Sequence, residues 1–545
     1  MISYFSMEIG LDNRFKNFAG GLGILAGDTL KSAADLGIDM VGITLNYSHG
    51  YFQQELDPVN GFQIEHPDNW DISKYLILED KQFELELATG NIKVRIWRYE
   101  IKGFKSIVPV YFLDTDFEAN TPENRSICYN LYTSDSELRL KQEILLGMGG
   151  VKALETLGLN NITKYHLNES HAAFAILKLR EDLKNPDIVK SKICFTTHTP
   201  VMHGHKVYPL DTLQKVLKSD DYNQISPADL DQGLFNMSKF CLNNASFSNA
   251  VSKKHAIISR TMFPGYEIDF ITNGVHSSSW SSQATKELFD KYLPGWQEDP
   301  MLLRNAEGIG DADIWETHHA NKIGLIELVK EKTGTALDKD IFTIGFGRRV
   351  DQYKRQDLIL HDIKRLQALA EKFDGLQVVF GGKAYPGSQA PDGSIATIYK
   401  LSKTDLGKLK IAYIPNYDME VSLTMVSGSD LWLNNPLKPL EASGTSGMKA
   451  ALNGVPNLSM VDGWWVEGVV EDVTGWAIGD QSLDQTSDEN DANLMYDALE
   501  NKVLPTYYLD SKKWIEIQKQ AISLNASHFN TERMLLEYVA KGYIK

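Results

Sequence analysis

The chain has 545 residues, of which 43% are hydrophobic and 23% are charged, which is ordinary for a globular protein and too long for one simple domain. With 55 Lys and Arg against 72 Asp and Glu, its net charge of −17 argues against a nucleic-acid surface and against an anionic membrane surface. No apolar run approaches the roughly 18 residues of a membrane helix. Three cysteines without a CxxC pair indicate neither a zinc site nor a disulfide framework, so we predict a cytoplasmic protein with no metal site. From the net charge and the short apolar runs we predict no nucleic-acid or membrane partner.

Short apolar runs rich in β-branched residues alternate with longer helix-like stretches along the chain. In the first half, strands are expected at Met40–Leu45, 108–113, 165–167, 193–197 and 270–272, and helices at 140–157 and 172–183. In the second half, strands are expected at 342–346, 377–380, 411–414, 431–433 and 457–461, and helices at 357–373, 419–426 and 514–543. Such alternation predicts parallel sheets with helices on both faces.

The two series of strands predict an α/β protein made of two doubly wound, Rossmann-like domains that face each other across a cleft. The expected N-terminal domain covers residues 1–276 and the expected C-terminal domain 277–528, divided at the Ser-rich stretch 277–282. Residues 529–545 are expected to form a helix that packs back on the N-terminal domain. Open α/β sheets bind ligands at the carboxyl ends of their strands, so the active site is expected in the cleft.

A glycine run, Ala19-Gly20-Gly21-Leu22-Gly23, precedes a helix expected over residues 24–36. Successive glycines let the backbone fold tightly against a ligand, and a helix start adds positive potential. The run lacks both the GxGxxG spacing and the Walker lysine, so a nucleotide site fits poorly. A structural turn competes with a binding loop as the interpretation of this glycine run.

Polar residues follow three expected strands of the first half. His198 lies in Thr196-Thr197-His198-Thr199-Pro200, and a lone histidine there is first of all a structural hydrogen-bond donor. Glu169 lies in Asn168-Glu169-Ser170-His171, where positioning is a better expectation than chemistry. Asn273, in Thr272-Asn273-Gly274-Val275, closes the series.

Four cations occur within eight residues directly after an expected strand, namely Arg348, Arg349, Lys354 and Arg355. Arginine offers a planar fork to phosphate and lysine a point charge. A solvated basic turn is the usual interpretation of such a cluster. Here its place after a buried strand, in an acidic protein, favours a bound anion.

The strongest segment runs from Pro439 to Gly454 as PLEASGTSGMKAALNG, a loop of small residues that leads into a helix near 447–452. Gly444 and Gly447 let backbone amides approach a ligand, and amides at a helix start favour phosphate. Lys449, early in that helix, would be partly shielded from water, which lowers a lysine pKa and favours imine formation with an aldehyde. Glu441 lies close enough in sequence to accept sugar hydroxyls in the same pocket. A purely structural turn is again the competing interpretation.

This segment resembles the pyridoxal-phosphate signature of the glycogen and α-glucan phosphorylase family, in which the lysine carries the cofactor as a Schiff base. It departs from the animal pattern at Ser446-Gly447, where those enzymes have Gly-Asn, and is similar to the bacterial and archaeal branch. The basic cluster, the glycine run and the His198 and Asn273 segments also resemble family blocks, and they occur in the family's order from about Tyr4 to about Glu467. The resemblance implies the two-domain GT-B glycosyltransferase architecture.

The resemblance also implies roles for individual residues. The implied catalytic residues are Lys449, Arg349, Lys354, His198 and Glu441. The residues implied to bind pyridoxal 5'-phosphate, covalently at Lys449, are Lys449, Thr445, Ser446, Arg348, Lys354 and Gly21. The residues implied to bind the sugar or the substrate phosphate are Gly20, Gly21, His198, Asn273, Glu441, Ser443 and Gly444. Lys383 is a secondary phosphate candidate, and Arg355 is a candidate for a structural role.

The implied activity is that of an α-1,4-glucan phosphorylase, which transfers the terminal glucose of a maltodextrin or glycogen-type glucan to inorganic phosphate and gives glucose 1-phosphate. The α configuration is retained, and the cofactor phosphate exchanges a proton with the substrate phosphate. The preferred glucan and the physiological direction stay open, and a homodimer is one option. Because the chain starts without the extension that carries phosphorylation and nucleotide control in animal enzymes, regulation of that type is not expected.

Three other functions compete with this interpretation. A nucleotide-sugar-dependent glucan synthase of the same architecture uses a similar Arg/Lys pair and a Glu, but has no need for a lysine at position 449. A non-catalytic glucan-binding protein could keep the fold, although the survival of the glycine, basic and lysine motifs together argues against it. An aminotransferase-type cofactor enzyme fits less well, because the surroundings of the lysine match phosphorylases over a long span.

Overall fold

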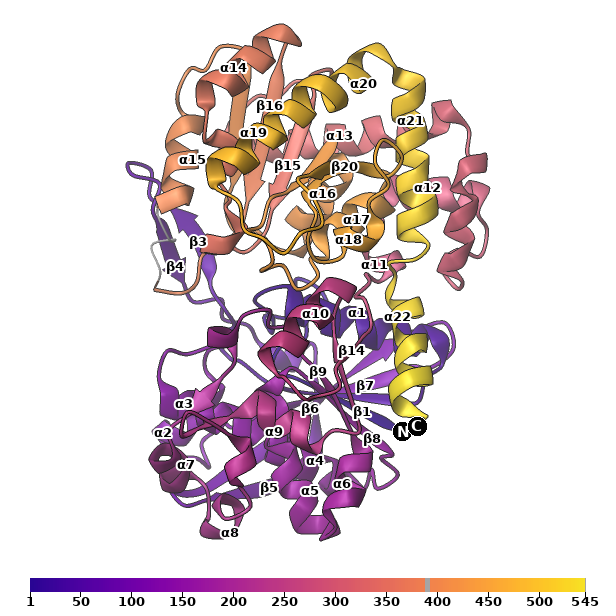
Figure 1. Cartoon of the computed structure of the whole chain (residues 1–545). Coiled ribbons are helices and arrows are strands. Elements are labelled where there is room, and N and C mark those ends of the chain that lie inside the picture. Colours follow the sequence, from indigo (N-terminus) through magenta and orange to yellow (C-terminus); the bar gives the residue numbers. More distant parts are fainter. Residues whose placement is uncertain (388–392, 545) are drawn as a thin grey trace. The chain divides into compact units, whose positions relative to one another are not determined.

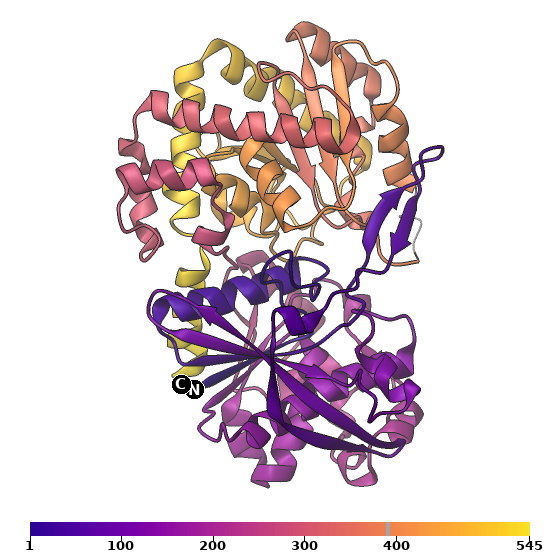
Figure 2. The same ribbon diagram turned by 180° about the vertical axis from the view of Figure 1, so that it is seen from behind.

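The computed structural model describes residues 1–387 and 393–544, and the contacts between their Cα atoms divide the chain into two compact units. Unit 1 consists of Met1–Tyr51, Pro67–Thr272 and Thr531–Lys545, and unit 2 of Phe52–His66 and Asn273–Asn530. Each unit is a predominantly parallel sheet with helices on both faces (Figures 1 and 2). The predicted α/β class is therefore confirmed.

Unit 1 is built on a nine-stranded sheet. Its strands, from one edge to the other, are β14 (Asp269–Phe270), β13 (Phe247–Ala250), β9 (Ile193–Thr196), β8 (Lys164–Asn168), β1 (Ile2–Ser6), β2 (Met40–Leu45), β7 (Ile107–Asp114), β6 (Gly90–Lys102) and β5 (Ile77–Leu87). The strands from β14 to β7 are parallel, whereas β6 and β5 are antiparallel to their neighbours. The order of the strands reverses at β1, which lies between β8 and β2.

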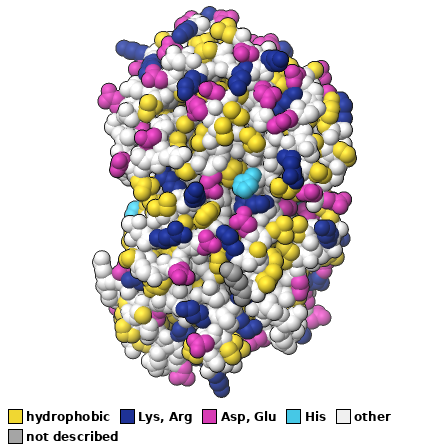
Figure 3. Space-filling model, turned by 45° about the vertical axis from the view of Figure 1, so that its right-hand side comes forward, with side chains coloured by type: hydrophobic (Ala, Val, Ile, Leu, Met, Phe, Trp, Pro, Cys, Tyr) yellow, Lys and Arg dark blue, Asp and Glu magenta, His cyan; other side chains and the backbone are white. Residues whose placement is uncertain are grey.

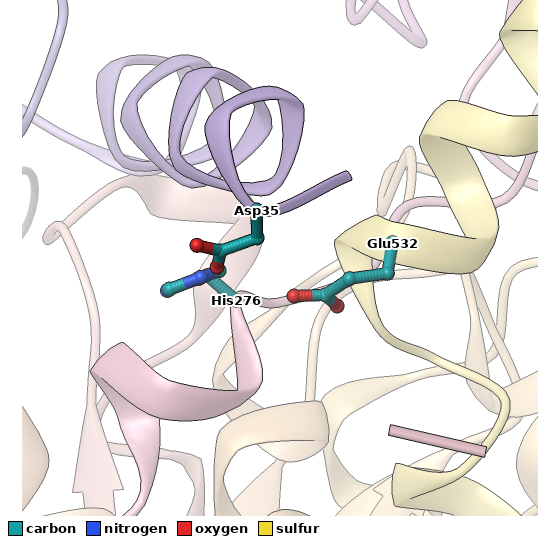
Figure 4. A group of neighbouring side chains, drawn as sticks. All are labelled: Asp35, His276 and Glu532. Carbon is teal, nitrogen blue, oxygen red and sulfur yellow. The ribbon is translucent and has the colours of Figure 1, made fainter. Parts of the chain in front are cut away.

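Helices cover both faces of this sheet and explain why its central strands are almost wholly buried. One face packs against α1 (Gly21–Leu36) and α22 (Thr531–Tyr538), and the other against α3 (Ser136–Ile144), α4 (Gly150–Leu157) and α5 (Ala175–Leu183). The C-terminal helix α22 thus contributes to the core of unit 1. Figure 4 shows Asp35 of α1 and Glu532 of α22, whose carboxylate oxygens lie within 4.8 Å of each other. His276, also labelled there, belongs to unit 2, and we infer no metal site from this group.

Unit 2 is built on a six-stranded, wholly parallel sheet. Its strands, in spatial order, are β17 (Leu409–Ile414), β16 (Leu376–Gly381), β15 (Thr343–Gly347), β18 (Leu431–Asn434), β19 (Asn457–Met460) and β20 (Gly475–Ile478). In chain order this is 3-2-1-4-5-6, the arrangement of dinucleotide-binding folds. The switch point, where ligands bind in such sheets, lies between β15 and β18.

The helices of unit 2 also form two layers. One face of the sheet packs against α14 (Ile363–Lys372), α19 (Asp488–Ala498) and α21 (Ser511–Gln520). The other packs against α13 (Asp311–Thr333), α16 (Met419–Gly428) and α17 (Ser446–Leu452). The helices α13 and α16 approach so closely that a Cβ on Gly428 would lie 2.6 Å from both Asn321 O and Leu325 Cβ.

A hairpin of β3 (Gln53–Leu56) and β4 (Gln63–His66) belongs to unit 2, although it lies within the expected N-terminal domain. The reason is physical, because the buried side chains of this hairpin accept hydrogen bonds from backbone amides in loops of unit 2. The main segment of unit 2 begins at Asn273, directly after Thr272 of unit 1.

Two long expected helices are interrupted in the structure. The expected helix 140–157 consists of α3, a π-helical turn at Leu145–Gly149 and α4. The expected helix 514–543 consists of α21, a π-helical turn at Ala521–Ala526 and, after a break, α22 and a second π-helical turn at Val539–Tyr543. Apolar periodicity continues through such a turn, so the sequence does not mark it.

The surface seen in Figure 3 carries charged side chains, whereas the cysteine thiols are buried. Across the face seen in Figure 3, basic side chains are interspersed with acidic ones. The described Cys128, Cys194 and Cys241 are buried and free, and burial raises the pKa of each thiol. Among residues 1–387 and 393–544, no helix has the length and apolar character needed to cross a bilayer.

The close approach of α13 and α16 predicts opposite outcomes for two glycines. We expect Gly428→Ala to destabilise unit 2 by about 1–3 kcal/mol, since its methyl group would overlap α13. Gly324→Ala, in the middle of α13, meets nothing within 4 Å and should stabilise by about 0.5–1 kcal/mol. Chemical unfolding of both variants measures the difference, and equal stabilities would contradict the described packing.

Candidate active site

The switch point of unit 2 brings together the two strongest motifs of the sequence. The basic cluster follows β15, and the loop that carries Glu441 follows β18, the neighbouring strand. The carboxyl ends of parallel strands share one edge of the sheet, so both loops emerge at the same place. Residues far apart in the sequence therefore meet: Arg348 and Glu441 are hydrogen-bonded although 93 positions separate them.

Glu441 lies between two cations. Lys354 Nζ lies 2.6 Å and 2.8 Å from the two Glu441 carboxylate oxygens, and Arg348 Nη2 lies 2.9 Å from Glu441 Oε2. The side chains of all three residues are at most 10% exposed. Two positive charges thus face one negative charge in a site shielded from water, which leaves a local excess of positive charge.

Burial and mutual charge shift the ionisation of this group. Burial, together with the charge of Arg348, lowers the pKa of Lys354 to about 7, although Glu441 opposes the shift. Burial alone would raise the pKa of Glu441, but the charges of Lys354 and Arg348 bring it below its usual range. Lys354 therefore changes its charge near neutral pH, and Glu441 remains a carboxylate.

The other cations after β15 and β16 have different surroundings. Arg355 is buried and bonds to Asn435 O, Pro436 O, Asp488 and Asp491, so it holds the loop together, as expected for a structural residue. Arg349 lies 4.6 Å from the centre of the Tyr385 ring and keeps 30% of its side chain exposed. Lys383 donates to Phe52 O at 2.8 Å and thus faces the β3–β4 hairpin.

The loop after β18 is shaped by backbone contacts. The Glu441 amide donates to Asp462 Oδ2 at 2.9 Å, and a Cβ on Gly463 would lie 2.3 Å from Ser443 O. Gly444 has a φ of +75°, a conformation that favours glycine. Asp462 and Gly463 follow the next strand, β19, and sequence reasoning did not single them out.

Lys449 lies in α17, between the sheet and a buried indole. It is 6% exposed, and its Nζ lies 3.4 Å from the centre of the Trp280 ring. The helix is fixed by Trp432 Nε1, which donates to Ser446 Oγ, and by Asn457 Nδ2, which donates to Gly447 O. Lys449 is therefore shielded from water, as expected. Its contact with Trp280 could not be predicted from the sequence, because the two residues are far apart along the chain.

Position 447 has no room for a side chain. A Cβ there would lie 2.4 Å from Asn457 Oδ1 and 2.9 Å from Trp464 Cζ2. The asparagine that stands at this position in the animal pattern would need Asn457 and Trp464 to move. The Ser446-Gly447 pair is thus matched to its own surroundings, and Ser446 and Thr445 form the start of α17.

At the switch point of unit 1, Glu8 holds the glycine run. Its Oε2 accepts from the amides of Ala19 at 2.6 Å and Gly20 at 3.1 Å, and its Oε1 accepts from Tyr132 OH at 2.6 Å. The Gly20 amide is therefore already engaged by a carboxylate in this structure, which differs from the expected contact of that amide with phosphate. A Cβ on Gly21 would meet nothing within 4 Å, so the space around Gly21 is open.

His198 and Glu169 follow β9 and β8 at the same edge of the unit 1 sheet. His198 Nε2 lies 2.7 Å from Asn168 Oδ1 and donates to it, so Nδ1 is left as an acceptor when the ring is neutral. Burial lowers the pKa of His198 to about 4, which makes the neutral ring the form present at pH 7.

Glu169 fixes the backbone next to His198. Its carboxylate accepts from the amides of Ser170 at 2.8 Å and His198 at 2.7 Å, and from Thr199 Oγ1 at 3.1 Å. Its φ of 73° and ψ of 165° lie in a region that costs about 1–3 kcal/mol for a residue other than glycine. The three bonds retain this conformation, which agrees with the expected positioning role.

The predicted site residues thus form one group in each unit. Unit 2 brings Arg348, Lys354 and Glu441 into direct contact and places Ser443, Gly444, Thr445, Ser446 and Lys449 on the same loop and helix. Unit 1 holds Gly20, Gly21 and His198 at the carboxyl edge of its sheet. Asn273, which is 4% exposed, follows β14 and begins the main segment of unit 2.

Comparison with known proteins gives a consistent result. A family model described as carbohydrate phosphorylase matches residues 12–99 and 210–478. The maltodextrin phosphorylase of Thermococcus litoralis is 39% identical over 100% of this chain and 70% of its own length. The glycogen phosphorylases of Aquifex aeolicus and Mycobacterium tuberculosis are 35% and 33% identical over 100% and 99% of this chain and 86% and 70% of their own lengths.

The ionisation of Lys354 predicts how anion binding depends on pH. Sulfate keeps its charge between pH 6 and 9, so its affinity reports the charge of the protein. With the pKa of Lys354 at about 7, the lysine is charged below pH 7 and loses its proton above it. We expect the calorimetric Kd for sulfate to be flat below pH 7 and to rise by up to about tenfold per pH unit above it.

A matched variant tests the assignment to this lysine. Lys354→Arg keeps a cation that stays charged throughout the range, so its sulfate affinity should be nearly independent of pH. An identical pH profile in the wild type and in Lys354→Arg would show that another group is responsible.

Proposed function

This chain belongs to the carbohydrate phosphorylase family, and from this membership we propose that it is an α-1,4-glucan phosphorylase. It transfers the terminal glucosyl residue of a maltodextrin or glycogen-type glucan to inorganic phosphate, with retention of the α configuration, and releases glucose 1-phosphate. The observation that carries the proposal is the buried cluster of Arg348, Lys354 and Glu441, because it offers cations to a phosphate and a carboxylate to sugar hydroxyls.

The residues around Lys449 fit pyridoxal 5'-phosphate. The lysine amine lies against an indole in a site shielded from water, which favours covalent attachment to an aldehyde. Among the described residues, Arg348 Nε and Nη1 and Ser443 Oγ are buried without a hydrogen-bond partner, so an anionic group beside them would satisfy donors that are otherwise costly. Lys449 would hold the cofactor, and Thr445, Ser446, Arg348 and Lys354 would contact it, while Gly21 is a contact that the family resemblance alone implies.

When bound, the cofactor supplies a phosphate group that can exchange a proton with the substrate phosphate. The protein's task is to hold two anions near each other although they repel. Lys354 and Arg349 would provide the positive charge for the substrate phosphate, and the Gly21 amide, on a residue with open space at its Cβ position, would provide a neutral donor. In such a shielded place each of these contacts is stronger than in water.

The sugar is oriented by His198, Asn273 and Glu441. The neutral His198 ring presents Nδ1 as an acceptor for a sugar hydroxyl, and its orientation is fixed by Asn168. When phosphate takes over the charge of Lys354, Glu441 can turn from the cations to the hydroxyl donors of the glucose. Ser443 and Gly444 line the same loop. The glucosyl C1–O4 bond breaks, O4 takes a proton from phosphate, and a phosphate oxygen forms the new bond to C1.

The direct test is an assay and a spectrum on the same preparation. Purified protein should show the absorbance of bound pyridoxal phosphate and should release phosphate from glucose 1-phosphate in the presence of a maltodextrin primer. A colourless protein that contains no vitamin B6 and consumes a sugar nucleotide would instead be a synthase, and would refute the proposal.

The role of Lys449 is tested by substitution. We expect Lys449→Ala to lose the cofactor absorbance and nearly all phosphorolysis, because the substitution removes the amine that would form the imine. Lys383→Ala is the matched control, since this lysine faces Phe52, and it should keep its cofactor. Full activity of Lys449→Ala without bound cofactor would contradict the assignment.

A further inference from the structure

The β3–β4 hairpin contains two buried glutamines where a hairpin usually buries apolar side chains. Gln54 is 5% exposed and Gln63 is 7% exposed, whereas their strand neighbours Gln53 and Ile64 face solvent. A two-stranded hairpin is marginally stable by itself, and buried amides are costly unless they are hydrogen-bonded. The contacts of these amides therefore show what the hairpin is built to bind.

Gln63 binds the backbone of the loop after β16. Its Oε1 accepts from the Ala384 amide at 2.9 Å, and its Nε2 lies 3.5 Å from Ala384 O. Next to it, Lys383 Nζ donates to Phe52 O at 2.8 Å. The Gln63 side chain thus contacts both the backbone N–H and the backbone carbonyl of Ala384.

Gln54 binds the loop after β17 in the same manner. Its side-chain Oε1 accepts a hydrogen bond from the backbone amide of Asn416 at 2.9 Å, and its backbone amide donates to the side-chain Oδ1 of Asn416 at 3.1 Å. Asn416 has a φ of +54°, so this loop is held in a conformation that needs support. Gln54 Nε2 also donates to Gln63 Oε1 at 2.8 Å, which joins the two glutamines into one unit.

Both loops touch the basic segment after β15. Ala384 pairs with Val350, Val350 N donates to Lys383 O at 2.9 Å, and Arg348 N donates to Gly381 O at 3.2 Å. A Cβ on Gly382 would lie 2.2 Å from Arg348 O, which shows how closely the two segments lie.

The second loop reaches the same place through the residue after Asn416. A Cβ on Gly347 would lie 2.8 Å from the Tyr417 ring, and one on Gly381 would lie 2.7 Å from it. Tyr417 therefore packs against the end of β15, immediately before Arg348. The two glutamines hold both loops that flank the basic segment.

We propose that Gln54 and Gln63 are positioning residues for the phosphate site, which they act upon through the loops after β16 and β17 and the basic segment 348–354. This inference rests on the proposed function for its substrate, inorganic phosphate. Neither glutamine touches the substrate. Their effect is to keep the backbone beneath Arg348 and Arg349 in one conformation, so that cations meet phosphate without further ordering.

The test compares Gln63→Leu with Gln53→Leu, which makes the same change at an exposed position of the same hairpin. Gln63→Leu keeps the volume but removes the hydrogen bonds to Ala384 and Gln54. We expect its KM for phosphate to rise about tenfold while its KM for maltodextrin changes less than about twofold. Gln53→Leu should leave both values unchanged.

Hydrogen exchange provides a second measurement that does not need activity. Amides of residues 348–354 and 381–387 should exchange faster in Gln63→Leu than in Gln53→Leu, with other segments unaffected. If Gln63→Leu does not fold, Gln54→Leu takes its place with the same expectations for the loop after β17.

The outcomes separate this inference from the proposed function. An unchanged phosphate KM together with unchanged exchange would overturn the inference, as would an equal rise of both KM values. Absence of phosphorolysis in the wild type would refute the proposed function, while faster exchange confined to the two segments would still support the positioning by the hairpin.

Discussion

The contact on which the site depends is the buried carboxylate of Glu441 between Lys354 and Arg348. Removing charged groups from water is expensive, so each member of this group is tolerable only because the others are present. The balance is incomplete while Lys354 is protonated, since two cations then face one anion. The site is therefore poised to gain a further negative charge, and this preference follows from the structure of unit 2 alone.

Unit 1 uses carboxylates in a different way. Glu8 and Glu169 each accept hydrogen bonds from two backbone amides and one hydroxyl, and each fixes a loop at the carboxyl edge of the sheet. Burial would raise the pKa of Glu169, but the imidazoles of His205, His171 and His198, together with the His198 amide, hold it below the usual range. A carboxylate in such a state is a poor proton donor at neutral pH. This agrees with a reaction in which phosphate, and not a pair of acidic side chains, handles the proton.

The sequence predicted those parts of the site whose residues lie together in one segment of the chain. The strand-to-helix motifs around Lys354 and Lys449 marked the loops that the switch point brings together, because alternation of strands and helices dictates a parallel sheet. The sequence did not predict contacts between distant segments, such as that of Lys449 with Trp280. It also missed Gln54 and Gln63, since a glutamine is normally read as a surface residue. Neighbours in sequence can differ as well, because the left-handed turn at Arg355 sends it into the interior, away from Glu441.

The three buried thiols have a practical consequence. Because the thiolate is the reactive form and burial raises the pKa of each cysteine, alkylating reagents should find little to modify in the folded chain. A single cysteine introduced on the surface of either unit would then take up a fluorescent or spin label against a silent background. Distances within the protein could therefore be measured by spectroscopy on labelled cysteines without first replacing the three buried native cysteines.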